Sequence, residues 1–278
     1  MSGPRVVALL SGGGAKAAAH VGAMRALAAA GLSPSHIVGT SMGAAIGACA
    51  AAGLEPDEIL DRVTLVGSMG VARSRWAPWA GLWLRSLLRG EPLRAAIAAL
   101  VPARSFDELR IPLTVTAADL DTGELVLFGV GGRSVPLVDA LWASCALPVF
   151  YPPVVLDGRR LADGGLRGVV PFAAAEHVAA DLVVAVDVGP GFDEAAAPVV
   201  ARYPPLIGLH NDTTGVLMAA LTEAELARWR TEPGRPELVY VRPRVERNAT
   251  FRVDRARVYA EEGARATAAA LASRAGCS

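Results

Sequence analysis

Ser41 carries the clearest chemical signature in this sequence, because Gly39, Ser41 and Gly43 form the pattern G-x-S-x-G. In that pattern a sharp turn from a strand into a helix exposes the serine hydroxyl, and small flanking residues let the chain pass close to itself. The hydroxyl then lies at a helix N-terminus, where unpaired N–H groups and the helix dipole favour negative charge. Taken alone, the pattern also fits a serine that is only a turn or N-cap residue. Ser41 is therefore a candidate nucleophile whose role depends on its neighbours.

Three consecutive glycines, Gly12, Gly13 and Gly14, follow the apolar run of residues 6–10. A Walker loop would end in Gly-Lys-Ser or Gly-Lys-Thr, whereas Lys16 is flanked by alanines. The spacing fits a dinucleotide fingerprint better, but that site needs an acidic residue after the second strand, and the first acid in the chain is Glu55. Beside a nucleophilic serine, the glycine N–H groups can instead stabilise the oxyanion of acyl transfer.

The base that would accept the serine proton has two kinds of candidate. A triad in the order Ser, Asp, His leaves His177 and His210 as the histidine. The other candidate is Asp163, which follows a short strand and precedes Gly164 and Gly165, where the chain can turn away from the carboxylate. Asp163 could also simply cap that glycine turn. A carboxylate base must lie within about 2.6–3.2 Å of the serine oxygen.

Apolar runs of strand length alternate with alanine-rich stretches, which is typical of a parallel sheet with helices on both faces. We predict one domain over residues 1–278, of class α/β, with three α/β/α layers and a mostly parallel central sheet. The expected strands are residues 6–10, 36–38, 113–117, 125–128, 154–156, 182–188 and 237–241. The expected helices are residues 17–30, 42–52, 56–66, 138–144, 171–179, 214–229 and 254–273. Residues 189–213, rich in Pro, Gly and Asp, are expected to form a loop.

These motifs together resemble the patatin-like phospholipase family: "SGGGAK", then "GTSMG", then a distant "DGG". Residues 116–128 and 140–154 also resemble that family. The resemblance implies a patatin-like fold and a serine lipid acyl hydrolase, of phospholipase A or lysophospholipase type, that forms an acyl-enzyme without a histidine. It implies Ser41 as nucleophile, Asp163 as base, Gly12, Gly13 and Gly14 as the oxyanion loop, and Lys16 at the family's basic position. The sequence departs from the family at Ala17, where glycine is common, and the resemblance says nothing of specificity beyond about residue 190.

Three rival functions stay open on the sequence. One is an esterase that uses Ser41 with a histidine triad on a soluble ester. Another is a module that binds a nucleotide or phosphate through "GGGAK". The last is a non-catalytic lipid-binding protein that retains the fold. Labelling by a fluorophosphonate probe separates the enzymes from the two binding modules.

A segment within residues 71–100 suggests how lipid could be reached. Trp76, Trp79 and Trp83 recur at helical spacing, and four arginines accompany them within residues 71–89. Tryptophan with arginine suits a membrane interface, although the same stripe also fits core or lid packing. We therefore expect either a lid or a membrane-facing helical segment here.

The composition limits the classes of partner and cofactor that we expect. Lys+Arg and Asp+Glu number 27 each, so no global charge points to nucleic acid, and the expected substrate is a phospholipid or another acyl lipid. The three cysteines have no metal-ligand spacing, and we expect no metal, no cofactor and no disulfide. The first apolar run is too short for a signal peptide, and no stretch reaches the roughly 20 residues of a membrane span. We expect a cytoplasmic protein that contacts membranes peripherally, and assign no oligomeric state.

Overall fold

The computed structural model describes residues 3–68, 90–191, 205–246 and 252–275. An eight-stranded sheet lies at its centre, with strands in the order β5-β6-β3-β2-β1-β7-β8 and with β4 paired to β3. The strands are β1 (Val6–Leu10), β2 (Pro34–Thr40), β3 (Leu113–Asp119), β4 (Leu125–Gly129), β5 (Val154–Leu156), β6 (Arg159–Asp163), β7 (Leu182–Val186) and β8 (Glu237–Val241). The strands β3, β2, β1, β7 and β8 are parallel neighbours, whereas β4, β5 and β6 join antiparallel.

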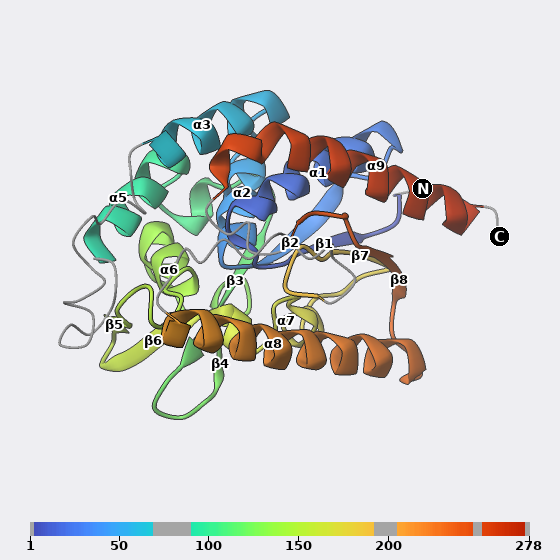
Figure 1. Cartoon of the computed structure of the whole chain (residues 1–278). Helices are drawn as coiled ribbons and strands as arrows, with labels where there is room; N and C mark the ends of the chain where they lie inside the picture. Colours follow the sequence, from blue (N-terminus) through green and yellow to red (C-terminus); the bar gives the residue numbers. More distant parts are fainter. Residues whose placement is uncertain (1–2, 69–89, 192–204, 247–251, 276–278) are drawn as a thin grey trace.

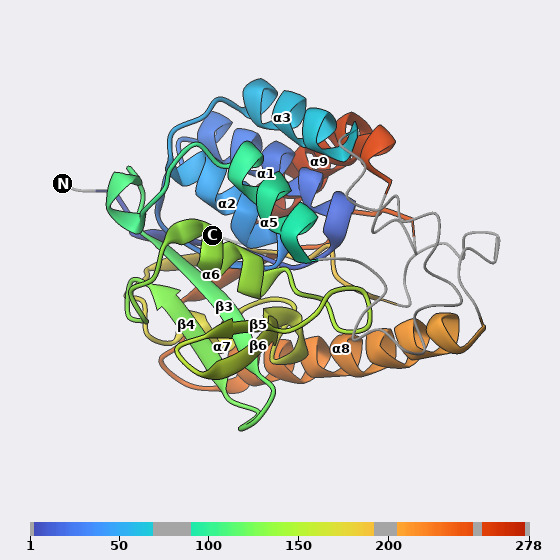
Figure 2. The ribbon, with the colours of Figure 1, turned by 90° about the vertical axis from the view of Figure 1, so that its left-hand side faces the viewer.

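Helices cover both faces of this sheet (Figure 1). The α-helices are α1 (Ala19–Ala29), α2 (Met42–Ala51), α3 (Pro56–Ser68), α5 (Gly90–Leu100), α6 (Leu137–Ser144), α7 (Phe172–Ala175), α8 (Pro205–Thr231) and α9 (Ala256–Ala275). Single 3-10 turns are η1 (Gly14–Ala18), η2 (Phe106–Glu108), η3 (Gly164–Leu166) and η4 (Val253–Arg255). Figures 1 and 2 show α1, α3 and α9 on one face and α8 on the other. The predicted three-layer α/β/α class is confirmed.

The central strands are buried on both faces because helices cover both, so they read as continuous apolar runs. All five residues of β1 are buried, and so are all five of β7. Two clusters of apolar side chains result, one on each face, and Trp229 of α8 belongs to the smaller of them. The short predicted strand at residues 36–38 is longer in the structure, where β2 reaches Thr40 and delivers the chain directly to Ser41.

The structure differs from the expected helices at α8 and at α7. Helix α8 begins at Pro205, so the prediction that residues 205–213 are loop is wrong. The helix expected over residues 171–179 is only the short α7. Residues 90–100, within the segment expected to be a lid or membrane-facing, form α5, whose buried face includes Leu93, Ile97 and Leu100.

Candidate active site

Ser41 lies on a strained turn between β2 and α2. Its backbone φ is 55° and its ψ is −132°, a conformation that a residue with a Cβ rarely adopts. The turn is held in part by the Ser41 N–H, which donates to Ser144 Oγ at 2.8 Å. Ser41 occupies the N-cap position of α2, but its side chain makes no capping hydrogen bond there.

The two glycines that flank Ser41 are required by close packing. A Cβ on Gly39 would lie 2.5 Å from Ala44 Cα, so the two sides of the turn touch there. A Cβ on Gly43 would lie 2.3 Å from the Ser11 carbonyl oxygen. Both distances are too short for a side chain, which explains why the pattern has glycine at each position. Gly43 thereby brings the start of α2 against the loop that contains Gly12.

Asp163 lies beside Ser41, although 122 positions separate them in the chain. The Ser41 hydroxyl donates to Asp163 Oδ2 at 2.7 Å, within the range that proton transfer requires. The other carboxylate oxygen, Oδ1, accepts the Gly165 N–H at 2.8 Å. Both acceptor atoms of the carboxylate are therefore used, and Oδ2 is the one directed at Ser41.

The register of β3 explains how the two side chains meet. Strand β2 pairs along one edge of β3 as far as Thr40, which lies opposite Thr116. The next residue of β3, Ala117, pairs with Asp163. Since β4 occupies the other edge of β3 at Ala117, β6 must continue the line of β2 just beyond its end. Asp163 thus occupies the position that follows Thr40, next to Ser41.

Burial sets the electrostatics of this pair. Asp163 is 4% exposed, and burial raises the pKa of its carboxyl to about 6, while hydrogen bonds from Ser41 and Gly165 oppose that rise. The thiol of Cys145 is buried beside both residues, and its pKa is raised by burial and by the Asp163 charge. The Asp163 carboxylate is consequently a stronger base than an exposed aspartate while remaining largely ionised at pH 7.

The glycine pair after Asp163 also has a steric reason. A Cβ on Gly164 would lie 2.4 Å from the Thr116 hydroxyl oxygen, so only glycine lets the chain pass β3 at this point. A Cβ on Gly165 would lie 3.1 Å from Asp163 Oδ1, the atom that its own N–H reaches. Asp163 does cap this turn, η3, and at the same time accepts from Ser41.

The glycine loop lies against the serine turn, as the sequence predicts. A Cβ on Gly12 would lie 3.3 Å from Ser41 Cβ. The Gly12 N–H, however, donates to the Val169 carbonyl at 3.0 Å, so the expectation that it is an oxyanion donor needs correction. In the described part of the chain, the N–H groups of Gly13 and Gly14 donate no such bond.

Gly13 and Lys16 attach the glycine loop to the turn that follows β7. Gly13 packs against Val188, whose carbonyl oxygen would lie 2.8 Å from a Cβ placed on that glycine. Gly14 has φ 59°, in the left-handed region that favours glycine. Lys16 is buried, and its Nζ donates to the Gly189 carbonyl at 3.4 Å. The basic side chain is thus attached to the turn that follows β7.

In the described residues, none of the four histidines forms a hydrogen bond with Ser41 or Asp163. His20 is fully buried, with Nε2 donating to the Ser11 carbonyl at 2.8 Å, and burial lowers its pKa to about 4. His36 Nε2 lies 2.9 Å from Thr114 Oγ1. His177, just after α7, and His210, on α8, are exposed. The alternative of a Ser-His-Asp triad therefore has no histidine in place.

The sequence alone did not point to Ser144. Its hydroxyl accepts the Ser41 N–H, yet it lies at the end of α6 within "WASCALP", with no recognisable motif. The prediction for Trp76, Trp79 and Trp83 concerns residues outside the described ranges. Over the described ranges, no helix is long and apolar enough to cross a membrane, and no cluster of metal ligands is found.

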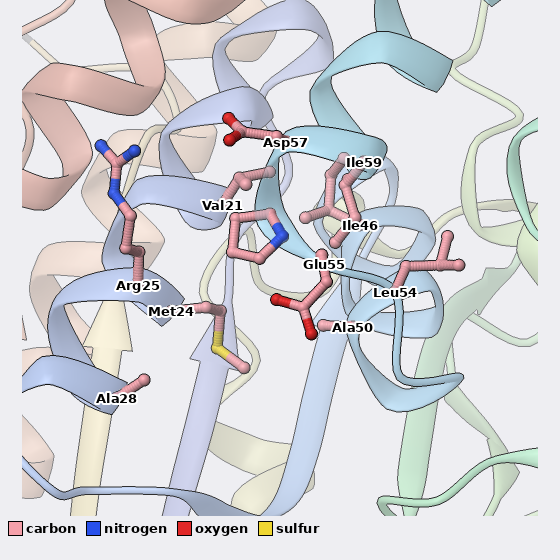
Figure 3. A pocket seen from close by; sticks show the side chains of 11 residues that line it. Val21, Met24, Arg25, Ala28, Ile46, Ala50, Leu54, Glu55, Asp57 and Ile59 are labelled. Carbon is pink, nitrogen blue, oxygen red and sulfur yellow. The ribbon is translucent and has the colours of Figure 1, made fainter.

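A hollow of about 480 Å³ lies elsewhere, between α1, α2 and the start of α3 (Figure 3). Its lining is apolar at Val21, Met24, Ile46, Leu54 and Ile59, with Arg25, Glu55 and Asp57 also contributing. Neither Ser41 nor Asp163 lines it. The chemistry described above is therefore separate from this hollow.

Comparison with known proteins adds the family context. Residues 9–176 match the family model described as patatin-like phospholipase. An uncharacterised NTE family protein of Mycobacterium tuberculosis is 36% identical over 190 residues, which is 66% of this chain and 49% of that protein. Patatin-like phospholipase domain-containing protein 7 of Rattus norvegicus is 28% identical over 195 residues, covering 68% of this chain and 14% of that protein.

A solved structure shows the same fold at low sequence identity. VipD from Legionella pneumophila matches with a TM-score of 0.53 and 16% identity, covering 98% of this chain and 67% of that chain. The chain spans about half the length of the mycobacterial relative and a smaller share of the mammalian one.

Proposed function

Because this chain belongs to the patatin-like phospholipase family, we propose that it hydrolyses fatty acyl esters of lipids, with Ser41 as nucleophile and Asp163 as base. The observation that carries the proposal is the hydrogen bond from Ser41 Oγ to Asp163 Oδ2 at 2.7 Å, made on the strained turn between β2 and α2. A buried carboxylate within proton-transfer distance removes the need for a histidine. The substrate class follows from the family.

The proposed reaction has two halves. Ser41 Oγ attacks the ester carbonyl carbon as its proton passes to Asp163, and the C–O bond to the leaving alcohol then breaks with that proton going to the alcohol. The acyl group is left as an ester of Ser41. In the second half, water gives a proton to Asp163 and attacks the acyl carbon, and Ser41 leaves with the proton as the fatty acid departs.

The oxyanion that forms in each half needs N–H donors that are not already used. We assign this role to the N–H groups of Gly13 and Gly14 rather than to that of Gly12. The start of α2, adjacent to Ser41, contributes the positive end of its helix dipole. Lys16 supports the loop through its bond to the turn after β7.

Lipid access is proposed at α8. Four apolar side chains on one side of this helix point to solvent, and we call them the α8 stripe: Leu206 at 74%, Leu209 at 63%, Val216 at 47% and Leu217 at 67% exposure. On the other side of the helix, the methyl group of Met218 lies 3.4 Å from where a Cβ on Gly165 would be. A lipid surface on the stripe would therefore lie close to the turn that holds Asp163. This is the peripheral membrane contact that we propose.

The rival functions make different predictions in one experiment. Wild-type protein, Ser41→Ala, Asp163→Asn and the double variant His177→Ala/His210→Ala are each divided into two samples. One sample is treated with a fluorophosphonate probe, and the other, untreated, is assayed on a lipid panel. We expect labelling and hydrolysis by the wild type and the histidine variant, and neither by the two dyad variants. Loss of activity in the histidine variant would support the triad, and an unlabelled wild type that binds nucleotide or lipid would support a binding module.

A further inference from the structure

The turn that follows β7, residues 187–189, forms the wall against which the glycine loop rests. The Val188 N–H donates to the Ser11 hydroxyl oxygen at 2.8 Å, just before the glycines. Gly13 packs so closely on Val188 that a Cβ there would lie 2.8 Å from both Val188 Cγ2 and its carbonyl oxygen. The direction of the Gly13 and Gly14 N–H groups therefore depends on where this turn is held.

Asp187 holds the turn from inside the protein. Only 3% of this residue is exposed, yet its carboxylate is fully engaged. Oδ1 accepts the Gly189 N–H at 2.8 Å, which closes the turn on itself. Oδ2 accepts the Tyr240 hydroxyl at 2.6 Å and lies 3.0 Å from Arg242 Nη1. The carboxylate thus connects the turn to the end of β8.

Arg242 and Lys16 strengthen the same connection. Arg242 Nη1 also donates to the carbonyl oxygens of Asp187, at 3.3 Å, and Gly189, at 3.1 Å. Lys16, from the turn that begins at Gly14, donates to that same Gly189 carbonyl. Two cations therefore meet at one backbone oxygen, with the Asp187 carboxylate as the nearby negative charge. Little water competes with these charge-assisted bonds, so together they contribute more than they would at the surface.

We propose that Asp187 is a positioning residue for the reaction: through Tyr240, Arg242 and the turn at 187–189, it fixes the glycine loop so that the Gly13 and Gly14 N–H groups point at the developing oxyanion. Asp187 touches neither Ser41 nor Asp163 by any contact found in the described residues. The inference rests on the function proposed above, since it concerns the oxyanion donors of that reaction. Its specific content is that the carboxylate acts on the transition state and leaves ground-state binding of substrate unchanged.

The chain offers a matched control at the other end of β7. Asp181 immediately precedes the strand and pairs with Arg5 at 2.8 Å, on the surface and away from the glycines. Asp187→Asn and Asp181→Asn therefore each remove one negative charge and one aspartate–arginine pair, at opposite ends of the same strand. Tyr240→Phe is a milder second variant, because it deletes only the hydroxyl that donates to Asp187.

Each variant is assayed with a soluble monomeric ester, so that membrane binding does not enter. For Asp187→Asn we expect kcat to fall about 10- to 100-fold with KM nearly unchanged, as misdirected oxyanion donors do. Tyr240→Phe should lower kcat in the same sense by roughly 3- to 10-fold. Asp181→Asn should leave both constants at the wild-type value. Thermal unfolding of each variant verifies that it is folded.

NMR of the glycine amides reports on the loop without an assay of activity. In protein labelled with ¹⁵N-glycine, the Gly13 and Gly14 amide resonances should move in Asp187→Asn and Tyr240→Phe and stay in place in Asp181→Asn. Folded variants with unmoved resonances would overturn the inference, and so would an effect on KM alone. If the wild type hydrolyses no ester but the resonances move, the proposed function fails while the positioning of the loop by Asp187 stands.

Discussion

Replacing Asp163 by asparagine should inactivate the protein and make it more stable at high pH. The buried carboxyl has its pKa raised from an ordinary 3.8 to about 6, so above pH 6 the folded state carries an unfavourable charge. That difference corresponds to about 3 kcal/mol of lost stability. Asparagine has the same shape and no charge, and its oxygen can still accept the Gly165 N–H.

The stability gained by Asp163→Asn should increase as the pH rises. Because the folded pKa lies above the unfolded one, the wild-type carboxyl contributes its full stability below about pH 4 and loses it as the pH rises through 6. The asparagine variant does not titrate here. The gain should therefore approach about 3 kcal/mol at pH 8, seen as a rise in Tm of roughly 5–10 °C, and should disappear near pH 4.

Urea unfolding of both proteins at pH 8 and pH 4 measures this difference. Asp119→Asn is the matched control, since Asp119 is also buried but its pKa is lowered by backbone N–H groups, first that of Asp121, and by Arg159. That variant should be less stable than wild type at pH 8. An Asp163→Asn protein that is no more stable at pH 8, or equally stabilised at both pH values, would refute the assignment of a raised pKa.

Three further predictions follow from the same geometry. Hydrolysis of a soluble ester should show kcat/KM that rises with pH and levels off above about 6, because the base must be ionised; a profile flat from pH 4 to 8 would contradict this. Gly43→Ala should abolish activity, because its Cβ would lie 2.3 Å from a carbonyl oxygen, whereas Gly208→Ala on α8 meets nothing within 4 Å and should leave kcat unchanged. Replacing the three leucines of the α8 stripe by aspartate should abolish flotation of the protein with phosphatidylcholine vesicles and leave hydrolysis of the soluble ester unchanged. Val258→Asp on α9 is the control. Vesicle binding that survives the leucine substitutions would refute the proposed membrane contact.

Much of the site could be predicted because side-chain chemistry marks it in the sequence. The glycines that flank Ser41 predict one tight turn, and Gly164 and Gly165 after Asp163 predict another, so each motif predicts its own backbone conformation. The structure brings Ser41 and Asp163 together, as those motifs suggest. The parallel order of the central strands likewise follows from their unbroken apolar runs.

Features that depend on distant partners left no such mark. The Gly12 N–H is used by the carbonyl of Val169, and a backbone acceptor cannot be recognised from residue type. Helix α8 begins in a stretch containing Pro205, Gly208 and Asp212, residue types that are typical of loops, yet contacts further along, such as that of Trp229 with Phe172, anchor it. Asp187 falls inside the strand expected over residues 182–188 and gives no sign of its role until Tyr240 and Arg242 are seen beside it.

Strand β3 fixes the distance between Ser41 and Asp163, because it pairs with both β2 and β6. Thr40 and Asp163 pair with consecutive residues of β3, so the register of this one strand sets the distance between the attacking oxygen and the proton acceptor. Slippage of the β5–β6 hairpin by a single residue would turn the Asp163 carboxyl to the opposite side of the sheet. A shift in register would therefore separate Asp163 from Ser41 completely, not move it slightly. A change in the length of a connection outside the sheet would therefore leave the spacing of Ser41 and Asp163 unchanged.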